Sequence, residues 1–382
     1  MSGQRVETID IFRGAAILMV VLFHFTARLP DQTLHIGAGG PLPVTFGWIG
    51  VYFFFIVSGY CIFMTLERSQ SVGVFLARRF SRLYPAFAAA VILLFVFQIV
   101  FAVPSVPEAH FREVAPSGVD LILNLMFLGE LGEWVNGSFW SIAVEIKFYL
   151  LVALLWAFIP DASRFSRVFG LLGLLSAPVW MASTVISGPG TITPQSMLKF
   201  LLIAPYVPFF AVGILGQRLK SGSTEVWPLM LANLLMCLGV IWVSAGGTEA
   251  EQAVWGQIIT TAVFGVLVAL FVVFSMGVRF PVLPGFSGAV AKLGLLSYSW
   301  YLIHETIGVT LLANLNLSMP AGVSLAETIL ATIGIAAVFS YLFEWRFRKG
   351  FERAAGAILD WVADRSSALA PLRTRAPATP AE

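Results

Sequence analysis

Apolar runs long enough to cross a lipid bilayer recur along the whole chain, and they constrain the fold more than any other feature. A helix needs about 20 consecutive apolar residues to cross ~30 Å of hydrocarbon. Charged residues make up only 12% of the chain, about half of the ~25% usual in soluble domains. The sequence therefore predicts an all-α membrane protein with ten spans, at about residues 15–30, 47–66, 83–103, 139–159, 167–187, 197–216, 227–245, 256–277, 294–314 and 322–343.

The distribution of basic residues predicts how these spans are oriented. Residues 119–131 are apolar but too few to cross as a straight helix. If they do not cross, alternate connections collect most of the arginines and lysines, as the positive-inside rule requires. If they do cross, every later connection changes sides and the rule fails. We therefore expect both termini in the cytoplasm and a re-entrant or interfacial segment near 119–131 on the outer side.

One membrane domain is expected over residues 1–350. Residues 351–382 form a cytoplasmic C-terminal segment, and its tail, rich in Pro, Ala and Ser, is expected to be disordered. Cys61 and Cys237 both lie inside apolar runs and predict core residues, not a disulfide or a metal site. No metal and no nucleic-acid partner is expected.

The first span carries a histidine in its middle and an arginine at its start. Arg13 and His24 are separated by ~16 Å along a helix and lie on one face, and Asp10 lies one turn before Arg13. Arg13, taken alone, is explained equally well by a functional role and by a role in orienting the first span in the membrane. His24 is a stronger candidate, because ionisable groups at this depth are costly and usually functional.

Two further segments carry small and basic residues, one inside the second span and one following it on the predicted cytoplasmic side. Gly50, Ser58 and Gly59 in the second span favour close helix packing. Arg79 and Arg82 lie three residues apart, so they share a helix face before Pro85. The positive-inside rule is enough to explain these arginines, but arginine clusters of this kind also bind phosphates. With Arg13 they would form one cytoplasmic anion site.

Two later spans carry ionisable residues as well. In "FWSIAVEIKFYL" the residues Ser141, Glu145 and Tyr149 step by four and share a face. Glu145 needs a partner in the membrane, and His24 at similar depth is the expected one. The sequence does not predict which group the Lys147 side chain contacts. His304, in "LGLLSYSWYLIHE", is explained equally by a structural and by a functional role.

Together these segments resemble the acyltransferase-3 family of integral membrane acyltransferases, over about residues 5–350. The resemblance rests on five motifs in the right order, carried by Arg13 and His24; Gly50, Phe54, Phe55, Ser58 and Gly59, with one residue of spacing difference; Arg79, Arg82 and Pro85; Trp140, Ser141, Glu145, Phe148, Tyr149 and Leu150; and Ser297, Tyr298, Tyr301, Leu302 and His304. The last span departs from the family's Glu-x-Pro pattern, because Trp345 and Arg346 follow Glu344. The soluble hydrolase-like domain of many members is not expected here.

The resemblance implies transfer of an acyl group, most often acetyl, from acyl-CoA to a hydroxyl of a glycan or glycolipid. Acetyl-CoA is then the expected donor, and the bacterial cytoplasmic (inner) membrane the expected location. His24, oriented by Glu145, is the expected general base or acyl relay, and Arg13, Arg79 and Arg82 are expected to hold the donor's phosphates. The expected supporting residues are Asp10, Ser58, Trp140, Ser141, Tyr149, Tyr301 and His304.

A proton-coupled transporter or flippase of a lipid-linked or small polar substrate is the alternative. His24 and Glu145 would then relay protons and Arg13 would gate the substrate. Against it, the sequence shows none of the internal repeats that many transporters have. A non-catalytic scaffold would leave the buried histidine and glutamate unexplained.

Overall fold

The computed structural model describes residues 7–28, 43–100, 116–186, 198–199, 201–246, 254–278, 285–346 and 350–351. These residues form helices and turns, with no strand among them. Eight of the described helices are long and apolar enough to cross a membrane, so the chain is an integral membrane protein. They are α1 (Glu7–Thr26), α3 (Ile49–Leu66), α4 (Val72–Val100), α6 (Trp140–Phe158), α7 (Ala162–Ile186), α10 (Trp227–Ala245), α11 (Val254–Ser275) and α14 (Ala321–Phe339).

The two other predicted spans are helical as well but depart from a simple crossing helix. α9 (Val207–Lys220) is short and almost entirely buried. α12 (Phe286–Ile303) continues through a π-helical turn, His304–Gly308, into α13 (Val309–Leu315). The count of ten spans and the cytoplasmic termini stay predictions, and most of the segment 351–382 lies outside the described residues.

The segment near 119–131 is short, as predicted. α5 (Gly118–Leu125) is followed by the 3-10 turn Gly129–Leu131. Ser117 and Asp120 form a capping box at the start of α5, which satisfies the first free backbone N–H groups. A helix of this length rises only ~12 Å, so it cannot cross a bilayer.

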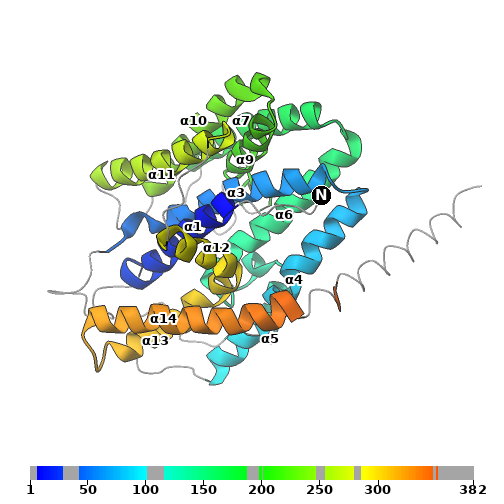
Figure 1. The fold of residues 1–382 in the computed structure, drawn as a ribbon. Helices are drawn as coiled ribbons and strands as arrows, with labels where there is room; N and C mark the ends of the chain where they lie inside the picture. Colours follow the sequence, from blue (N-terminus) through cyan, green and yellow to red (C-terminus); the bar gives the residue numbers. More distant parts are fainter. Residues whose placement is uncertain are drawn as a thin grey trace, which may run out of the picture.

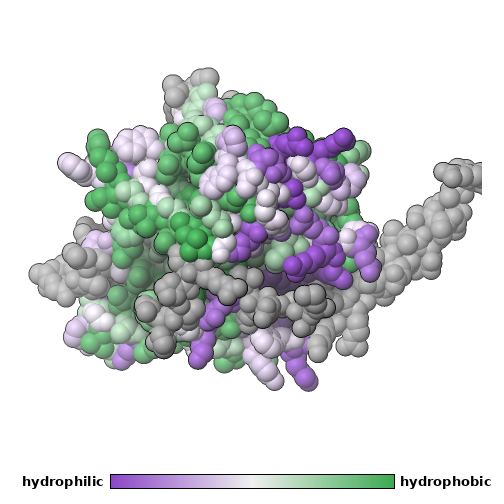
Figure 2. All heavy atoms as spheres, turned by 45° about the horizontal axis from the view of Figure 1, so that its top comes forward, coloured by the Kyte–Doolittle hydropathy of each residue, from purple (hydrophilic) through white to green (hydrophobic). Residues whose placement is uncertain are grey.

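α1, α3 and α12 lie in the middle of the bundle, with α7, α10 and α11 on one side and α4 and α14 on the other (Figure 1). Hydrophilic residues gather toward one end of the bundle, and apolar residues cover much of the visible surface between the ends (Figure 2). Below, the end near Arg13 is called the Arg13 end, and the opposite end, where α1 finishes at Thr26 and α3 begins at Ile49, is called the His24 end.

Glycines let the central helices approach until backbones touch. A Cβ on Gly294 of α12 would lie 1.8 Å from the carbonyl oxygen of Asp10 in α1. A Cβ on Gly59 of α3 would lie 2.3 Å from the Phe210 oxygen in α9, and one on Gly50 would lie 2.5 Å from the Ala16 oxygen. The predicted packing role of Gly50 and Gly59 is confirmed.

Candidate functional site

A cavity of about 120 Å³ lies between α1, α3, α4, α6 and α12, inside the bundle. We call it the arginine cavity. It brings together eight of the predicted site residues from five separate helices, namely Arg13, Ser58, Arg79, Arg82, Ser141, Glu145, Tyr149 and Tyr301.

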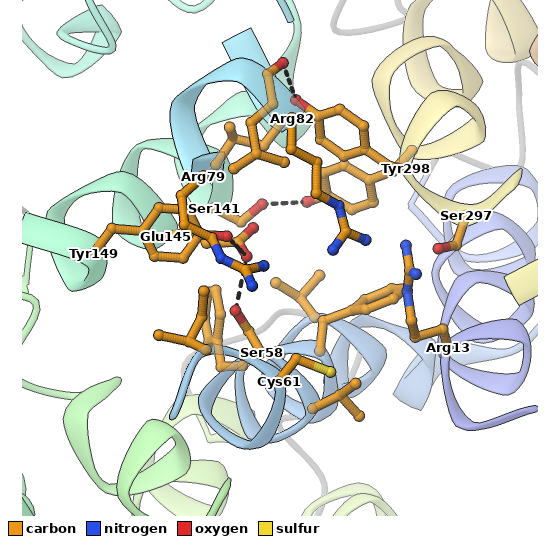
Figure 3. A pocket seen from close by; sticks show the side chains of 18 residues that line it. Arg13, Ser58, Cys61, Arg79, Arg82, Ser141, Glu145, Tyr149, Ser297 and Tyr298 are labelled. Carbon is orange, nitrogen blue, oxygen red and sulfur yellow. Dashed lines mark hydrogen bonds between the residues drawn. The ribbon is translucent and has the colours of Figure 1, made fainter. Parts of the chain in front are cut away.

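Three guanidinium groups are directed into this cavity, Arg13 from α1 and Arg79 and Arg82 from α4 (Figure 3). α4 begins at Val72, before the predicted span, so these arginines belong to the membrane helix itself and not to a preceding loop. Arg79 is buried and donates to the hydroxyl of Thr65, while its Nε has no partner among the described residues. The neighbouring Arg78 is exposed. Among the residues that the structure describes, Glu145 is the one carboxylate that lines the arginine cavity, so positive charge is in excess there.

Glu145 is held by hydroxyl groups inside the arginine cavity. Ser58 donates a 2.7 Å hydrogen bond to Glu145 Oε1, and the Tyr149 hydroxyl donates to the same oxygen. Ser141, Glu145 and Tyr149 all face the cavity, as their four-residue spacing predicts. His24 is not among the partners of Glu145, and it does not line the cavity. The predicted His24–Glu145 pair is therefore wrong.

A group of hydroxyls lies on the side of the arginine cavity that faces the His24 end. Ser141 Oγ and Tyr301 OH lie 2.6 Å apart, and Tyr301 also donates to the Ser138 carbonyl at 3.0 Å. Asn136 precedes this segment, accepts from the Ser138 N–H, and donates to the Leu302 carbonyl at 3.0 Å. These bonds fix the start of α6 against the end of α12.

Beyond Tyr301 lies a second polar group, which we call the histidine cluster: His24, Arg28, His304 and Glu305. His24 Nδ1 lies 2.8 Å from the Val20 carbonyl and 3.3 Å from His304 Nε2. His304 Nδ1 lies 2.9 Å from the Tyr301 carbonyl. Because a carbonyl oxygen only accepts, both Nδ1 atoms carry the ring proton, and both Nε2 atoms are free to accept.

An ion pair covers the basic nitrogen of His24. Arg28 Nη1 donates to His24 Nε2 at 2.9 Å and lies 2.8 Å from Glu305 Oε1. Glu305 Oε1 is itself 3.8 Å from His24 Nε2, and Glu305 Oε2 has no partner among the described residues. His24 and His304 are buried, whereas 46% of the Arg28 side-chain surface is exposed.

Arg28 and Glu305 were missed by the sequence reasoning. In the sequence Arg28 follows His24 by four residues, which would place both side chains on one face if the helix continued past Thr26, a signal that was available. Glu305 follows His304 directly, and on a regular helix the two side chains would diverge by ~100°. The π-helical turn that begins at His304 changes this spacing, and no sequence rule locates such a turn.

The remaining predicted site residues, Asp10 and Trp140, lie outside both groups. Asp10 is buried at the contact of α1 with α12. Trp140 packs its ring against Phe55 and Tyr206. Lys147, which had no predicted place, forms an ion pair with Glu130, and Glu344 accepts a hydrogen bond from Ser299. Cys61 lines the arginine cavity and Cys237 is buried, both as free thiols.

Comparisons with known proteins identify the family of the chain. The chain matches the acyltransferase-3 family, described as an acyltransferase domain, over residues 6–345. It is 30% identical over 210 residues to the peptidoglycan O-acetyltransferase OatA of Listeria monocytogenes, covering 50% of this chain and 30% of that protein. It is 28% identical over 211 residues to an O-acetyl transferase of Shigella phage Sf6, covering 50% of this chain and 59% of that protein. The O-acetyltransferase OatA of Staphylococcus aureus is 24% identical over 183 residues, covering 44% of this chain and 27% of that protein.

The matched parts thus span between 27% and 59% of the length of these three relatives. No solved structure is significantly similar to the chain.

Proposed function

Since the chain belongs to the acyltransferase-3 family, we propose that it is a membrane O-acetyltransferase that moves an acetyl group from acetyl-CoA to a hydroxyl of a glycan or glycolipid. The bacterial cytoplasmic membrane is its proposed location. The observation that carries the proposal is the arginine cavity, where three cations from two helices face one space. Of the acceptors to test, peptidoglycan comes first, because one relative is named for it.

The arginine cavity supports a donor that carries phosphates. Guanidinium groups bind phosphate oxygens through paired, charge-assisted hydrogen bonds. The three guanidinium groups face one shared space, an arrangement suited to the phosphate end of the donor. Arg13, Arg79 and Arg82 then hold the phosphate end at the Arg13 end of the bundle, which we assign to the cytoplasm because the basic connections gather there.

The histidine cluster supplies the proton chemistry. Arg13 and His24 are separated by ~16 Å along α1, within reach of an extended pantetheine arm. His24 Nε2 takes the proton of the acceptor hydroxyl as that oxygen attacks the thioester carbonyl. The new C–O bond forms, the C–S bond breaks, and the proton passes from His24 to the departing thiolate.

Glu305 replaces Glu145 as the acidic partner of His24 in this mechanism. When His24 gains a proton it stands beside the Arg28 cation, and a nearby carboxylate offsets the added charge. Glu305 Oε1 lies 3.8 Å from His24 Nε2, and Oε2 is free to accept. His304, at 3.3 Å from His24, fixes the orientation of its ring. Glu145 instead offsets part of the positive charge of the arginine cavity.

Transfer of radiolabelled acetyl groups from acetyl-CoA to a glycan tests the proposal. The purified protein in lipid nanodiscs is incubated with acetyl-CoA radiolabelled in the acetyl group and with peptidoglycan fragments or other bacterial glycans. We expect ester-linked label on a sugar hydroxyl, removable by mild base. A protein that moves substrate across proteoliposomes while no glycan gains label would instead be a transporter, and the proposal would be wrong.

A further inference from the structure

Arg28 stands at the point where the reacting atoms of the proposed transfer must meet. Its Nη1 lies 2.9 Å from His24 Nε2, the atom that accepts the acceptor's proton. An acceptor hydroxyl that donates to this nitrogen takes the place of the Arg28 N–H. The guanidinium then lies next to the hydroxyl oxygen and next to the carbonyl that this oxygen attacks.

Neighbouring residues hold the Arg28 guanidinium in position when its contact with His24 is broken. Glu305 Oε1 accepts from Nη1 at 2.8 Å, independently of the contact with His24. Gly137 lies against this pair, and a Cβ at Gly137 would lie 2.5 Å from Glu305 Oε1 and 3.2 Å from Arg28 Nη2. The close approach of the Gly137 backbone leaves the pair little room to move. A guanidinium has five N–H donors, so donors remain for a second oxygen.

From this geometry we infer that Arg28 is a catalytic residue that stabilises the oxyanion formed when the acceptor attacks the thioester, and that Glu305 and Gly137 position it. The inference rests on the proposed function and deepens it. Negative charge develops on the carbonyl oxygen in the transition state, and a cation held beside that oxygen stabilises it. As the C–S bond breaks, the negative charge passes from the carbonyl oxygen to the departing sulfur. Arg28 neither gains nor loses a proton in this step.

The role predicts a loss in turnover, not in substrate binding. Removing one oxyanion donor costs about 10²–10³ in kcat in well-studied enzymes. We expect Arg28→Ala to lose this order of kcat with little change in KM for acetyl-CoA. Because part of Arg28 is exposed, ethylguanidinium added to Arg28→Ala should restore part of the rate. Arg167→Ala is the matched control, since Arg167 is exposed on α7, away from both polar groups.

Gly137→Ala is the second variant, because it displaces the pair without removing a charge. We expect a smaller loss of kcat with KM for acetyl-CoA unchanged. The experiment measures kcat and KM for both substrates in the full-length protein in nanodiscs, with and without ethylguanidinium. Arg28→Ala at the parent rate overturns the inference while the proposed function stands. A rise in KM for the acceptor at unchanged kcat also overturns it, because Arg28 would then bind substrate. If the parent itself transfers no acetyl group, the proposed function and this inference fail together.

Discussion

Replacing Arg79 with alanine should weaken use of the donor far more than it changes turnover. Arg79 faces the arginine cavity and is buried, and its hydrogen bond to Thr65 holds the guanidinium in place. A hydrogen bond to a charged group contributes about 1.5–3 kcal/mol. At about 1.4 kcal/mol per factor of ten, this is roughly ten- to hundredfold in apparent affinity for acetyl-CoA. The relief of repulsion among three cations offsets part of this, so the lower half of the range is expected.

Two variants on neighbouring residues make the Arg79 test specific. Arg78 is adjacent in sequence but exposed, so Arg78→Ala removes the same charge from the same helix without opening the cavity. Thr65→Val keeps Arg79 but removes its hydroxyl partner. We expect parent-like binding in Arg78→Ala and a loss in Thr65→Val smaller than that in Arg79→Ala.

The assay is binding of acetyl-CoA to the protein in nanodiscs by calorimetry, with KM for acetyl-CoA measured in parallel. The reasoning is refuted if Arg79→Ala binds acetyl-CoA as the parent does. It is also refuted if Arg78→Ala and Arg79→Ala lose affinity equally, because the effect would then come from overall charge and not from the cavity.

Three further outcomes follow from the geometry. His24→Ala should abolish transfer while acetyl-CoA binding stays intact, since His24 does not line the arginine cavity; transfer at the parent rate would make the histidine a packing residue. Glu305→Gln should lower kcat by more than Glu145→Gln, because Glu305 and not Glu145 lies beside His24; the opposite order in steady-state kinetics would contradict this. Gly59→Ala should lower stability by about 1–3 kcal/mol through overpacking, seen as a lower Tm in detergent, whereas Gly334→Ala, with nothing within 4 Å of its added Cβ, should not.

The sequence alone was sufficient to predict the class of the protein and the grouping of Arg13, Arg79 and Arg82 that face the arginine cavity. Hydrophobic run length depends only on local composition, so the membrane helices and the short segment near 119–131 were predictable. Helix periodicity is local as well. It places Arg79 and Arg82 on one face and Arg78 on another, which is what the structure contains.

The partners of each buried charge depended on the tertiary structure. The sequence predicts a pair of Glu145 and His24 because it places both at similar depth, but an expected depth along the membrane normal leaves open which helices are neighbours. The close packing of α1 with α12 at Gly294 brings His304 and Glu305 to His24, while Glu145 faces Ser58 and Tyr149 across the arginine cavity. Glu305 lies in the π-helical turn that begins at His304, and its carboxylate pairs with Arg28. Contacts of this kind join residues as far apart as His24 and His304, and only the folded bundle determines them, because lateral packing depends on the shapes of whole helix surfaces.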